Sequence, residues 1–241
     1  MTENYHKWYS QPIGEDFEML VFGEEGIPLI LFPPAKSRYY DYKDFGVIES
    51  LANYIDERKI KVYCPDSYTP KCWQNYSIEP QQRVKQYLAF EQTVLQDILG
   101  FANFETEENQ YLFAGFGFGA YYALHLMLKY PSLAKGVLTI GGEFDVKQFI
   151  QGHFDEGAYL NSPLDYLFGL NETSYLKVYR NTKIILGTGT LDDSFEQNKY
   201  ISKLLYEKKV NHLLDVYPYK LNTFDDCKLL LNNNLHYIIE E

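Results

Sequence analysis

The residues whose order is most suggestive of chemistry lie in the segment FAGFGFGAYYA, residues 113–123. An apolar strand is predicted to run into a tight glycine turn, after which a helix begins at once. This order is typical of the nucleophile elbow, G-x-S-x-G, in which a sharp strand-to-helix turn exposes a serine hydroxyl. At the serine position of that pattern this chain has Gly117, which has no side chain with which to attack a substrate.

The same turn keeps groups that can bind without a nucleophile. The N–H of Phe118 is expected at the N-terminus of a helix, where backbone donors bind anions or carbonyl oxygens. Ala35, in the loop after a predicted strand at 28–33, is the candidate for a second donor. The alternative interpretation is that these glycines serve only the close packing of strand and helix.

The letters G-x-G-x-G-A also invite comparison with a dinucleotide-binding loop. That fingerprint belongs to the first strand–helix–strand unit, and its third glycine comes one residue later than here. Glu143 follows the next predicted strand, but at a longer spacing than a ribose-binding acid usually has. No His, Cys, Asp or Glu cluster has metal-ligand spacing, and Cys64 and Cys72 are expected as packed or surface thiols. We therefore expect neither a metal nor a cofactor.

Strands and helices are predicted to alternate along the chain. The apolar runs that predict strands are 17–22, 28–33, 61–65, 110–115, 135–142, 183–189 and 212–219. The segments with helical spacing are 44–58, 79–100, 118–130, 194–208 and 224–239. Residues 143–181 are irregular and aromatic, which predicts a cover or lid with short helices, and His6 is placed before the first strand.

This alternation predicts an α/β fold with a mostly parallel central sheet and helices on both faces, in a single domain over residues 1–241. Ligands of such sheets gather at the carboxyl ends of the strands. The candidate site is therefore expected on the loops after residues 33, 66, 115, 142, 189 and 219.

With these elements in place, the chain resembles the α/β-hydrolases, and in particular the small bacterial esterases related to esterase D. The stretches that carry the resemblance are FPPAKSRYYDYKDFGVIESLANYI (32–55), VYCPDSYTPKCWQNYSIEPQQRV (62–84), GFGFGAYYALHLMLKYPSLAKGVLTIGG (115–142), FDEGAYLNSPLDYL (154–167) and HLLDVY (212–217). They span nearly the whole chain. The resemblance implies the α/β-hydrolase fold and a Ser, Asp and His triad in that chain order.

At two of the three triad positions that the resemblance implies, this chain has a residue that cannot do the chemistry. Gly117 stands for the serine, and Thr223 is the best match for the histidine, in a loop, 218–226, that contains no histidine. Thr190 stands for the acid, although Asp192 or Asp193 can replace it after a small shift. These two aspartates are also suited to cap the helix that follows. His153, in the cover, is a histidine that can approach the site from a different position.

Charge and cysteine content limit the partners and the compartment. The chain carries a net charge of −11 at pH 7, and it has no cluster of Lys and Arg, so nucleic acid and anionic lipid are not expected as partners. No run of about 20 apolar residues predicts a membrane span, and MTENYHKWYS shows no signal peptide. Three cysteines without framework spacing predict reduced thiols in a cytoplasmic protein.

The sequence therefore favours an esterase homologue without catalysis, which binds a small molecule or a protein partner at the vestigial site. The first alternative is an active carboxylesterase that uses other residues, or residues of a second chain. The second is a structural protein-interaction module. An oligomer is compatible with each of these hypotheses.

Overall fold

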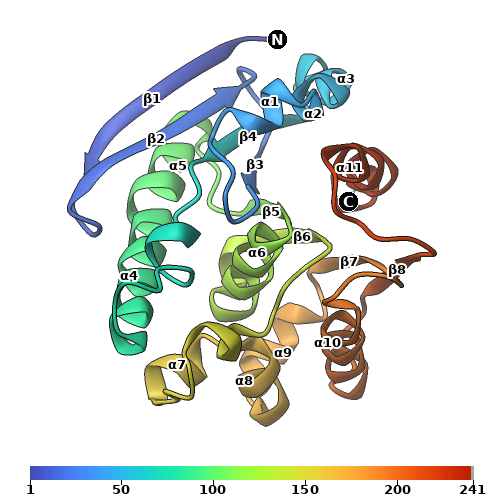
Figure 1. The fold of residues 1–241 in the computed structure, drawn as a ribbon. Helices are drawn as coiled ribbons and strands as arrows, with labels where there is room; N and C mark the ends of the chain where they lie inside the picture. The colour runs from blue at the N-terminus through green and yellow to red at the C-terminus, as the bar shows by residue number, and fades with distance from the viewer. Residues whose placement is uncertain (240–241) are drawn as a thin grey trace.

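The apolar runs predicted as strands lie together in one eight-stranded sheet, in the order β1-β2-β4-β3-β5-β6-β7-β8 (Figure 1). The computed structural model describes residues 1–239. The strands are β1 (Glu3–Ser10), β2 (Glu15–Phe22), β3 (Ile27–Phe32), β4 (Ile60–Pro65), β5 (Tyr111–Phe116), β6 (Ala134–Ile140), β7 (Lys183–Gly189) and β8 (Leu213–Tyr217). Strand β2 is antiparallel to β1 and β4, and the other neighbours are parallel. The prediction of a mostly parallel sheet is confirmed.

Helices cover both faces of this sheet. The α-helices are α1 (Asp41–Asp44), α2 (Val47–Ser50), α3 (Ala52–Asp56), α4 (Pro80–Thr93), α5 (Leu99–Thr106), α6 (Phe118–Lys129), α7 (Glu156–Leu160), α8 (Pro163–Gly169), α9 (Thr173–Tyr179), α10 (Phe195–Glu207) and α11 (Phe224–Ile239). The other helical segments are η1 (Thr69–Lys71), η2 (Val94–Ile98), η3 (Pro131–Leu133) and η4 (Val146–Phe149).

The two faces have separate cores. Figure 1 shows α1–α3 and α11 on one side of the sheet and α4, α6 and α10 on the other. Leu51 and Leu230 belong to the buried cluster of the first side, and Phe118 and Ile201 to that of the second. Strand β5 is buried along its whole length because it lies between the two layers. A strand in this position reads as a continuous apolar run, which is why its position is predictable from the sequence.

Strand β1 is absent from the sequence-based prediction, and His6, expected before the first strand, lies within it. This strand is at the edge of the sheet and pairs with β2 alone. Its residues are mostly exposed, with only Ser10 fully buried, so the segment lacks the apolar run by which a central strand is found.

Two of the predicted helices differ in extent. The segment 44–58 is divided between the last residue of α1 and the short helices α2 and α3, because Gly46 lies in the left-handed region with φ 73° and Leu51 leaves helical geometry at the next junction. The predicted helix at 79–100 continues to Thr106 through the π-helical turn η2. Neither difference moves the loops at the carboxyl ends of the strands.

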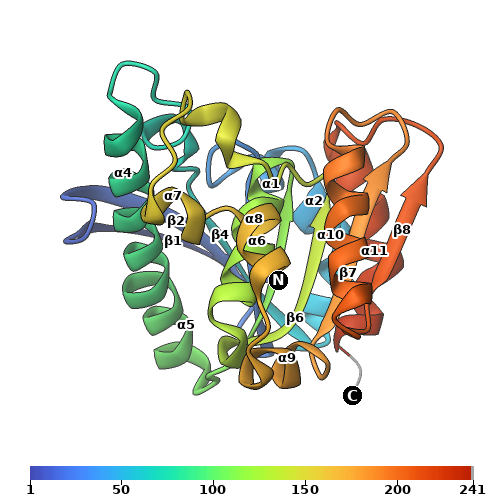
Figure 2. The same ribbon diagram turned by 90° about the horizontal axis from the view of Figure 1, so that it is seen from below.

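The predicted cover at 143–181 contains η4 and the short helices α7, α8 and α9. Figures 1 and 2 show α7 and α8 over the outer side of α6. The buried Arg83 of α4 ties this cover to the fold, since its guanidinium donates to the carbonyl of Phe149 over 2.6 Å and to that of Asn75 over 2.8 Å. Within residues 1–239, no helix is both long and apolar enough to cross a membrane.

Candidate functional site

The turn between β5 and α6 has the backbone geometry of a nucleophile elbow. Gly117 lies at φ 57° and ψ −120°, a conformation that side chains rarely adopt, and its N–H donates to the carbonyl of Ile140 over 2.8 Å. A Cβ placed on Gly117 would find Pro34 as its nearest neighbour, at 3.9 Å. The space above residue 117 is therefore open, and the backbone alone disfavours a side chain there.

The two flanking glycines have a different role. A Cβ on Gly119 would lie 2.1 Å from the carbonyl oxygen of Phe32, and a Cβ on Gly115 would lie 2.2 Å from the backbone of Gly119. These positions require glycine because strand and helix approach each other too closely for any side chain. The packing interpretation therefore accounts for Gly115 and Gly119, and it leaves Gly117 to be explained by its own conformation.

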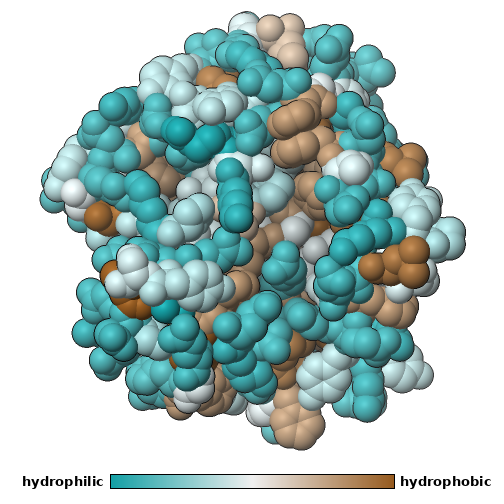
Figure 3. Space-filling view, in the orientation of Figure 1, coloured by the Kyte–Doolittle hydropathy of each residue, from teal (hydrophilic) through white to brown (hydrophobic). Residues whose placement is uncertain are grey.

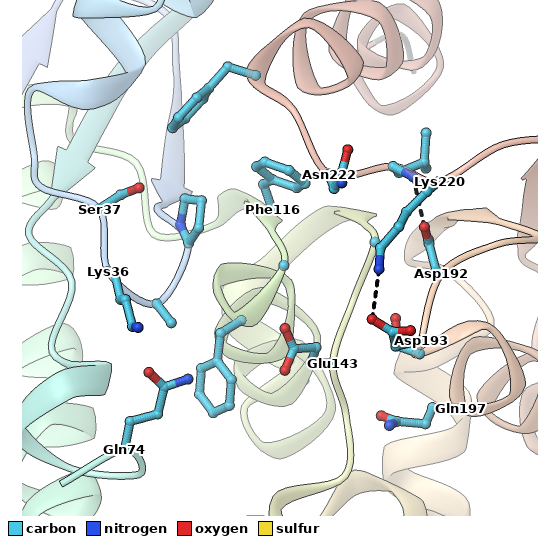
Figure 4. A pocket seen from close by; sticks show the side chains of 18 of the residues that line it. Lys36, Ser37, Gln74, Phe116, Glu143, Asp192, Asp193, Gln197, Lys220 and Asn222 are labelled. Atoms are coloured by element: carbon cyan, nitrogen blue, oxygen red, sulfur yellow. Dashed lines mark hydrogen bonds and ion pairs between the residues drawn. The ribbon is translucent and has the colours of Figure 1, made fainter.

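Gly117 lies in the wall of a cavity of about 630 Å³, a size typical of small-molecule sites. Figure 4 shows this cavity, with Glu143 between Gln74 and Asp193. Its lining comes from the segments after β3, β4, β5, β6, β7 and β8, as predicted for the carboxyl ends of the strands. The residues are Pro34, Ala35, Lys36, Ser37, Gln74, Phe116, Gly117, Phe118, Gly141, Glu143, Gln148, Asp192, Asp193, Ser194, Gln197, Lys220, Leu221, Asn222 and Phe224.

Both expected backbone donors are at this cavity. Phe118 is the first residue of α6, so its N–H has no acceptor inside the helix. Ala35 lies in the loop after β3, and its carbonyl accepts from the Ser67 hydroxyl over 2.9 Å. Within residues 1–239, neither N–H donates to another backbone group. The pair is thus available to a ligand oxygen, and their joint use by one oxygen stays a prediction.

Asp192 is a carboxylate held at the carboxyl end of β7. One of its oxygens accepts the N–H of Gly189 over 2.7 Å and the other accepts the N–H of Leu221 over 2.7 Å. The Thr188 hydroxyl adds a third hydrogen bond, over 3.2 Å. Asp192 therefore joins the end of β7 to the loop that follows β8, which is where the sequence resemblance places an acid and a histidine.

The neighbouring candidates for the acid have other partners. Thr190 is exposed, and its N–H donates to the carbonyl of Tyr217 over 2.8 Å, which continues the pairing of β7 with β8. The side chain of Asp193 is 95% exposed and pairs with Lys220 over 2.7 Å. The expected cap of α10 by either aspartate is wrong: the N-cap residue is Ser194, and the carboxylate of Asp192 is engaged with Gly189 and Leu221 instead.

Thr223, the position matched to the histidine, begins the last helix rather than facing the cavity. Its hydroxyl donates to Asp226 over 2.7 Å and accepts the N–H of Asp226 over 3.2 Å, and its own N–H donates to the same carboxylate over 2.9 Å. This reciprocal pattern is a capping box at the start of α11. From the same loop, Lys220, Leu221 and Asn222 line the cavity in its place.

The five histidines all fall within residues 1–239, and none of them lines the cavity. His153 is close in sequence to the cavity-lining Gln148, but its Nε2 lies 3.0 Å from the Asp155 carboxylate. His125 is fully buried in α6, where its ring nitrogens contact the Tyr166 hydroxyl at 3.0 Å and the Asn161 side chain at 3.1 Å. Burial lowers the pKa of His125, so it is neutral at pH 7.

Glu143 lines the cavity, although the sequence analysis considers it only as a ribose-binding acid in a dinucleotide site. It follows β6, and its N–H lies 3.4 Å from the carbonyl oxygen of Gly117, so backbone contact holds it beside the elbow. Burial raises the pKa of its carboxyl, and the charge of Asp193 raises it further. Among residues 1–239, no group donates a hydrogen bond to this carboxylate. Its position directly after a predicted strand was the signal that could have identified it.

Two side chains of α10 fix the segment that carries Glu143. The Gln197 side-chain oxygen accepts the N–H groups of Phe144 over 2.7 Å and Asp145 over 2.8 Å. The buried Asn198 donates to the carbonyl of Gly142 over 2.8 Å. The segment on both sides of Glu143 is therefore anchored, and the carboxylate is presented to the cavity from a fixed backbone.

Other chemistry is not assembled in the described part of the chain. Within residues 1–239, no group of three His, Cys, Asp or Glu side chains is placed to hold a metal ion. All three cysteines are buried, and burial raises the pKa of the Cys72 thiol to about 12, so it is protonated at neutral pH. Buried, protonated thiols are poor nucleophiles.

Comparison with known proteins places this geometry in a familiar architecture. No protein-family model and no curated protein matches the sequence. Among solved structures, a ferulic acid esterase is similar over 99% of this chain and 98% of its own, with TM-score 0.79 and 11% identity. An S-formylglutathione hydrolase from Agrobacterium tumefaciens is similar over 99% of this chain and 94% of its own, with TM-score 0.74 and 12% identity.

A third similar structure is S-formylglutathione hydrolase (FrmB) from Staphylococcus aureus, with TM-score 0.69 and 13% identity over 99% of this chain and 97% of that one. At such identities the likeness concerns the fold alone. The strand order, the elbow between β5 and α6 and these structural neighbours together establish that the chain has the α/β-hydrolase fold.

Proposed function

We propose that this protein is a non-catalytic relative of esterases that binds a ligand in the cavity beside Gly117. The observation that carries the proposal is the elbow itself: its backbone has the form that presents a nucleophile, and residue 117 has no side chain to present. The space above it is open and belongs to a cavity of about 630 Å³. A small molecule is the favoured occupant, and a side chain of a protein partner is the other.

The expected loss of catalytic rate argues against esterase turnover by the usual serine mechanism. In a comparable serine hydrolase, loss of the serine alone lowers kcat by about 10⁶. The oxyanion donors and substrate binding that remain give about 10³–10⁴ over water. The missing serine is accompanied by the lack of a histidine at the cavity, so the usual base for an alternative hydroxyl is missing too.

The role of Asp192 fits this proposal. In a hydrolase the acid orients a histidine, whereas here both oxygens of Asp192 accept backbone N–H groups, from Gly189 and Leu221. The carboxylate thereby stabilises the junction of two loops at the rim of the cavity. We infer that Asp192 has a structural role in shaping the binding site.

The proposal is tested by activity and by ligand-dependent stability. Pure protein is incubated with short activated esters and with a serine-directed fluorophosphonate, and neither turnover nor stoichiometric labelling is expected. A kcat near the enzyme median of about 10 s⁻¹ would overturn the proposal. In a thermal-shift screen, binders should raise the melting temperature in proportion to the logarithm of their concentration.

A working hydrolase with unusual residues is the second candidate, and Glu143 is the observation that favours it. Its carboxyl faces the cavity with a raised pKa, which suits a general base that activates water. If ester turnover is found, Glu143→Gln should abolish it, whereas a contaminating esterase would be unaffected. A structural interaction module is the third candidate, and it is favoured if no small molecule shifts the melting temperature.

We further propose a reducing, cytoplasmic environment, because the three cysteines are free and buried.

A further inference from the structure

Glu143 lines the cavity, and among residues 1–239 no hydrogen bond or ion pair joins its carboxylate to another group. Figure 4 shows its side chain within the cavity, between Gln74 on one side and Asp193 and Lys220 on the other. Lys220 pairs with Asp193 over 2.7 Å, so this nearby cation is engaged with another carboxylate. A half-buried carboxylate without a partner is unfavourable for the free protein, and it is stabilised by any cation that enters.

Carboxylates outnumber lysines in the wall of the cavity, since Glu143, Asp192 and Asp193 line it together with Lys36 and Lys220. The charged group that shifts the pKa of Glu143 is Asp193, a second carboxylate, and burial acts in the same direction. The chain as a whole carries a net charge of −11, which raises the local concentration of cationic molecules. The face seen in Figure 3 is largely hydrophilic, with hydrophobic residues in small separate groups.

The other walls of the cavity offer two further kinds of contact to a ligand: backbone hydrogen-bond donors and apolar surface. The N–H groups of Phe118 and Ala35 are available to an oxygen acceptor. Phe116 and Phe224 line the cavity as an edge-to-face pair with ring centroids 6.0 Å apart, and they offer apolar surface. An anionic group, an N–H pair and an aromatic wall thus lie around one space of about 630 Å³.

We propose that the ligand of this cavity is a small organic cation: a molecule with an ammonium group bound by Glu143, a carbonyl oxygen bound by the N–H groups of Phe118 and Ala35, and an apolar body against Phe116 and Phe224. Amines of amino-acid or peptide type have this combination. The inference rests on the proposed function and names the chemical class of the ligand for the same site.

The test compares two probes that differ in one group. The first is 3-amino-4-phenylbutanamide, which has an ammonium group, an amide carbonyl and a phenyl ring. The second is 4-phenylbutanamide, which lacks only the amine. Calorimetric titration of the full chain at neutral pH should give a dissociation constant at least about tenfold lower for the cation, since a charged hydrogen bond contributes more than a neutral one.

Two substitutions test whether Glu143 causes the tighter binding of the cationic probe. In Glu143→Gln, the ratio of the two dissociation constants should fall to about one, because the amide keeps the shape and removes the charge. In Glu57→Gln the preference should persist, because the exposed Glu57 pairs with Lys59 away from the cavity and its removal changes the net charge equally. A preference that survives Glu143→Gln would overturn the inference.

A cavity-filling substitution separates this inference from the proposed function. Ala35→Phe should abolish binding of both probes, since Ala35 lines the cavity. If both probes bind equally well and both are lost in Ala35→Phe, the cation preference is wrong and the binding function stands. If neither probe binds, the inference is wrong, and the ligand screen described above decides the binding function on its own. Ester turnover at enzymatic rates would overturn the proposed function whichever probe binds.

Discussion

The conformation of Gly117 leads to a stability prediction at the residue scale. Gly117→Ala and Gly117→Ser should each lower the free energy of unfolding by about 1–3 kcal/mol, since a Cβ at φ 57° is strained although it has room. The two variants should behave alike, because the strain comes from Cβ and not from the hydroxyl. Denaturant melts of both variants and of the parent protein measure the difference.

Gly100→Ala is the matched control for this experiment. Gly100 lies in helix α5, and a Cβ there would have no neighbour within 4 Å. This substitution should raise stability by about 0.5–1 kcal/mol, because alanine has the higher helix propensity. If Gly117→Ala is as stable as the parent while Gly100→Ala behaves as expected, the strained elbow is not the state of the protein in solution.

A second residue-scale prediction concerns the restoration of chemistry. Gly117→Ser alone should give no ester turnover, because a serine hydroxyl without a base is a weak nucleophile at neutral pH. Adding a histidine should help more at Asn222 than at Thr223, since Asn222 lines the cavity and Thr223 caps α11. Turnover of an activated ester by the single variant and the two double variants provides the comparison. Equal rates for all three would mean that the base is misplaced.

The elbow shows what sequence can and cannot predict at this scale. The glycine pattern predicts the turn, and a positive φ at residue 117 follows from it. The roles of Thr223 and Asp192 were not predictable in the same way, because a shift of one residue decides whether a loop side chain faces a cavity or caps a helix. The sequence shows Glu143, but only the tertiary structure shows that no group among residues 1–239 donates a hydrogen bond to its carboxylate.

At the scale of elements, an ion pair between the partly exposed Lys129 and the buried Glu91 joins helices α4 and α6. Lys129 donates to the two carboxylate oxygens of Glu91 over 2.7 and 2.9 Å, and the Tyr130 hydroxyl donates to the same group over 2.9 Å. Burial alone would raise the pKa of Glu91, but interactions with His125 and Lys129 outweigh it and lower the pKa to about 2. Since His125 is neutral at pH 7, Lys129 is the cation that holds Glu91 ionised there.

This pair gives a pH-dependent prediction. Lys129→Met should destabilise the protein by about 1–3 kcal/mol at pH 7, because it leaves a buried carboxylate without its cation. The sign follows from the lowered pKa: the contribution of Glu91 is complete above its ordinary value of 4.5 and is lost as pH falls towards about 2. The gap between variant and parent should therefore narrow below pH 4.5 in denaturant melts.

Lys199→Met is the control, since Lys199 forms an exposed pair with Glu196 within α10. Its effect should be small at every pH, as is usual for surface pairs. If the loss caused by Lys129→Met does not depend on pH, that loss comes from packing and not from the charge of Glu91.

The helices and strands were predictable where burial requires a recognisable run or spacing of apolar residues in the sequence. The central strands and helix α6 follow from apolar runs and from the glycine turn. The edge strand β1 was missed because its residues are largely exposed. The break at Gly46 was missed because apolar spacing continues across it, while a left-handed residue interrupts the backbone hydrogen bonds.

At the scale of the whole molecule, we infer a single domain. One sheet contains strands from residue 3 to residue 217, and α11 returns from its far edge to pack on β6 in the middle. The inference concerns residues 1–239, because residues 240 and 241 lie outside the described range.

The net charge of −11 gives a prediction at this scale. The protein should bind neither duplex DNA nor vesicles with anionic headgroups, even at low salt, where electrostatic attraction is strongest. Gel-shift and vesicle co-sedimentation assays measure the two interactions, with a basic protein as a positive control. Binding that weakens as salt is added would reveal a basic surface and contradict the expectation.

The close contact between helix α6 and its neighbouring strands also bears on how such a molecule can change over time. Gly115 and Gly119 fix the path of the turn by steric exclusion, and neither would touch a substrate. The packing of strand and helix thereby maintains the shape of the turn, whether or not selection acts on catalytic turnover. In a saturation-mutagenesis library, positions 115 and 119 should be intolerant, whereas position 117, where a Cβ has room, should accept small side chains such as Ala and Ser at a moderate cost in stability. Substitutions at residue 117 and in the cavity can therefore change the protein from an enzyme to a binding protein without loss of the turn, because packing of the interior maintains the turn.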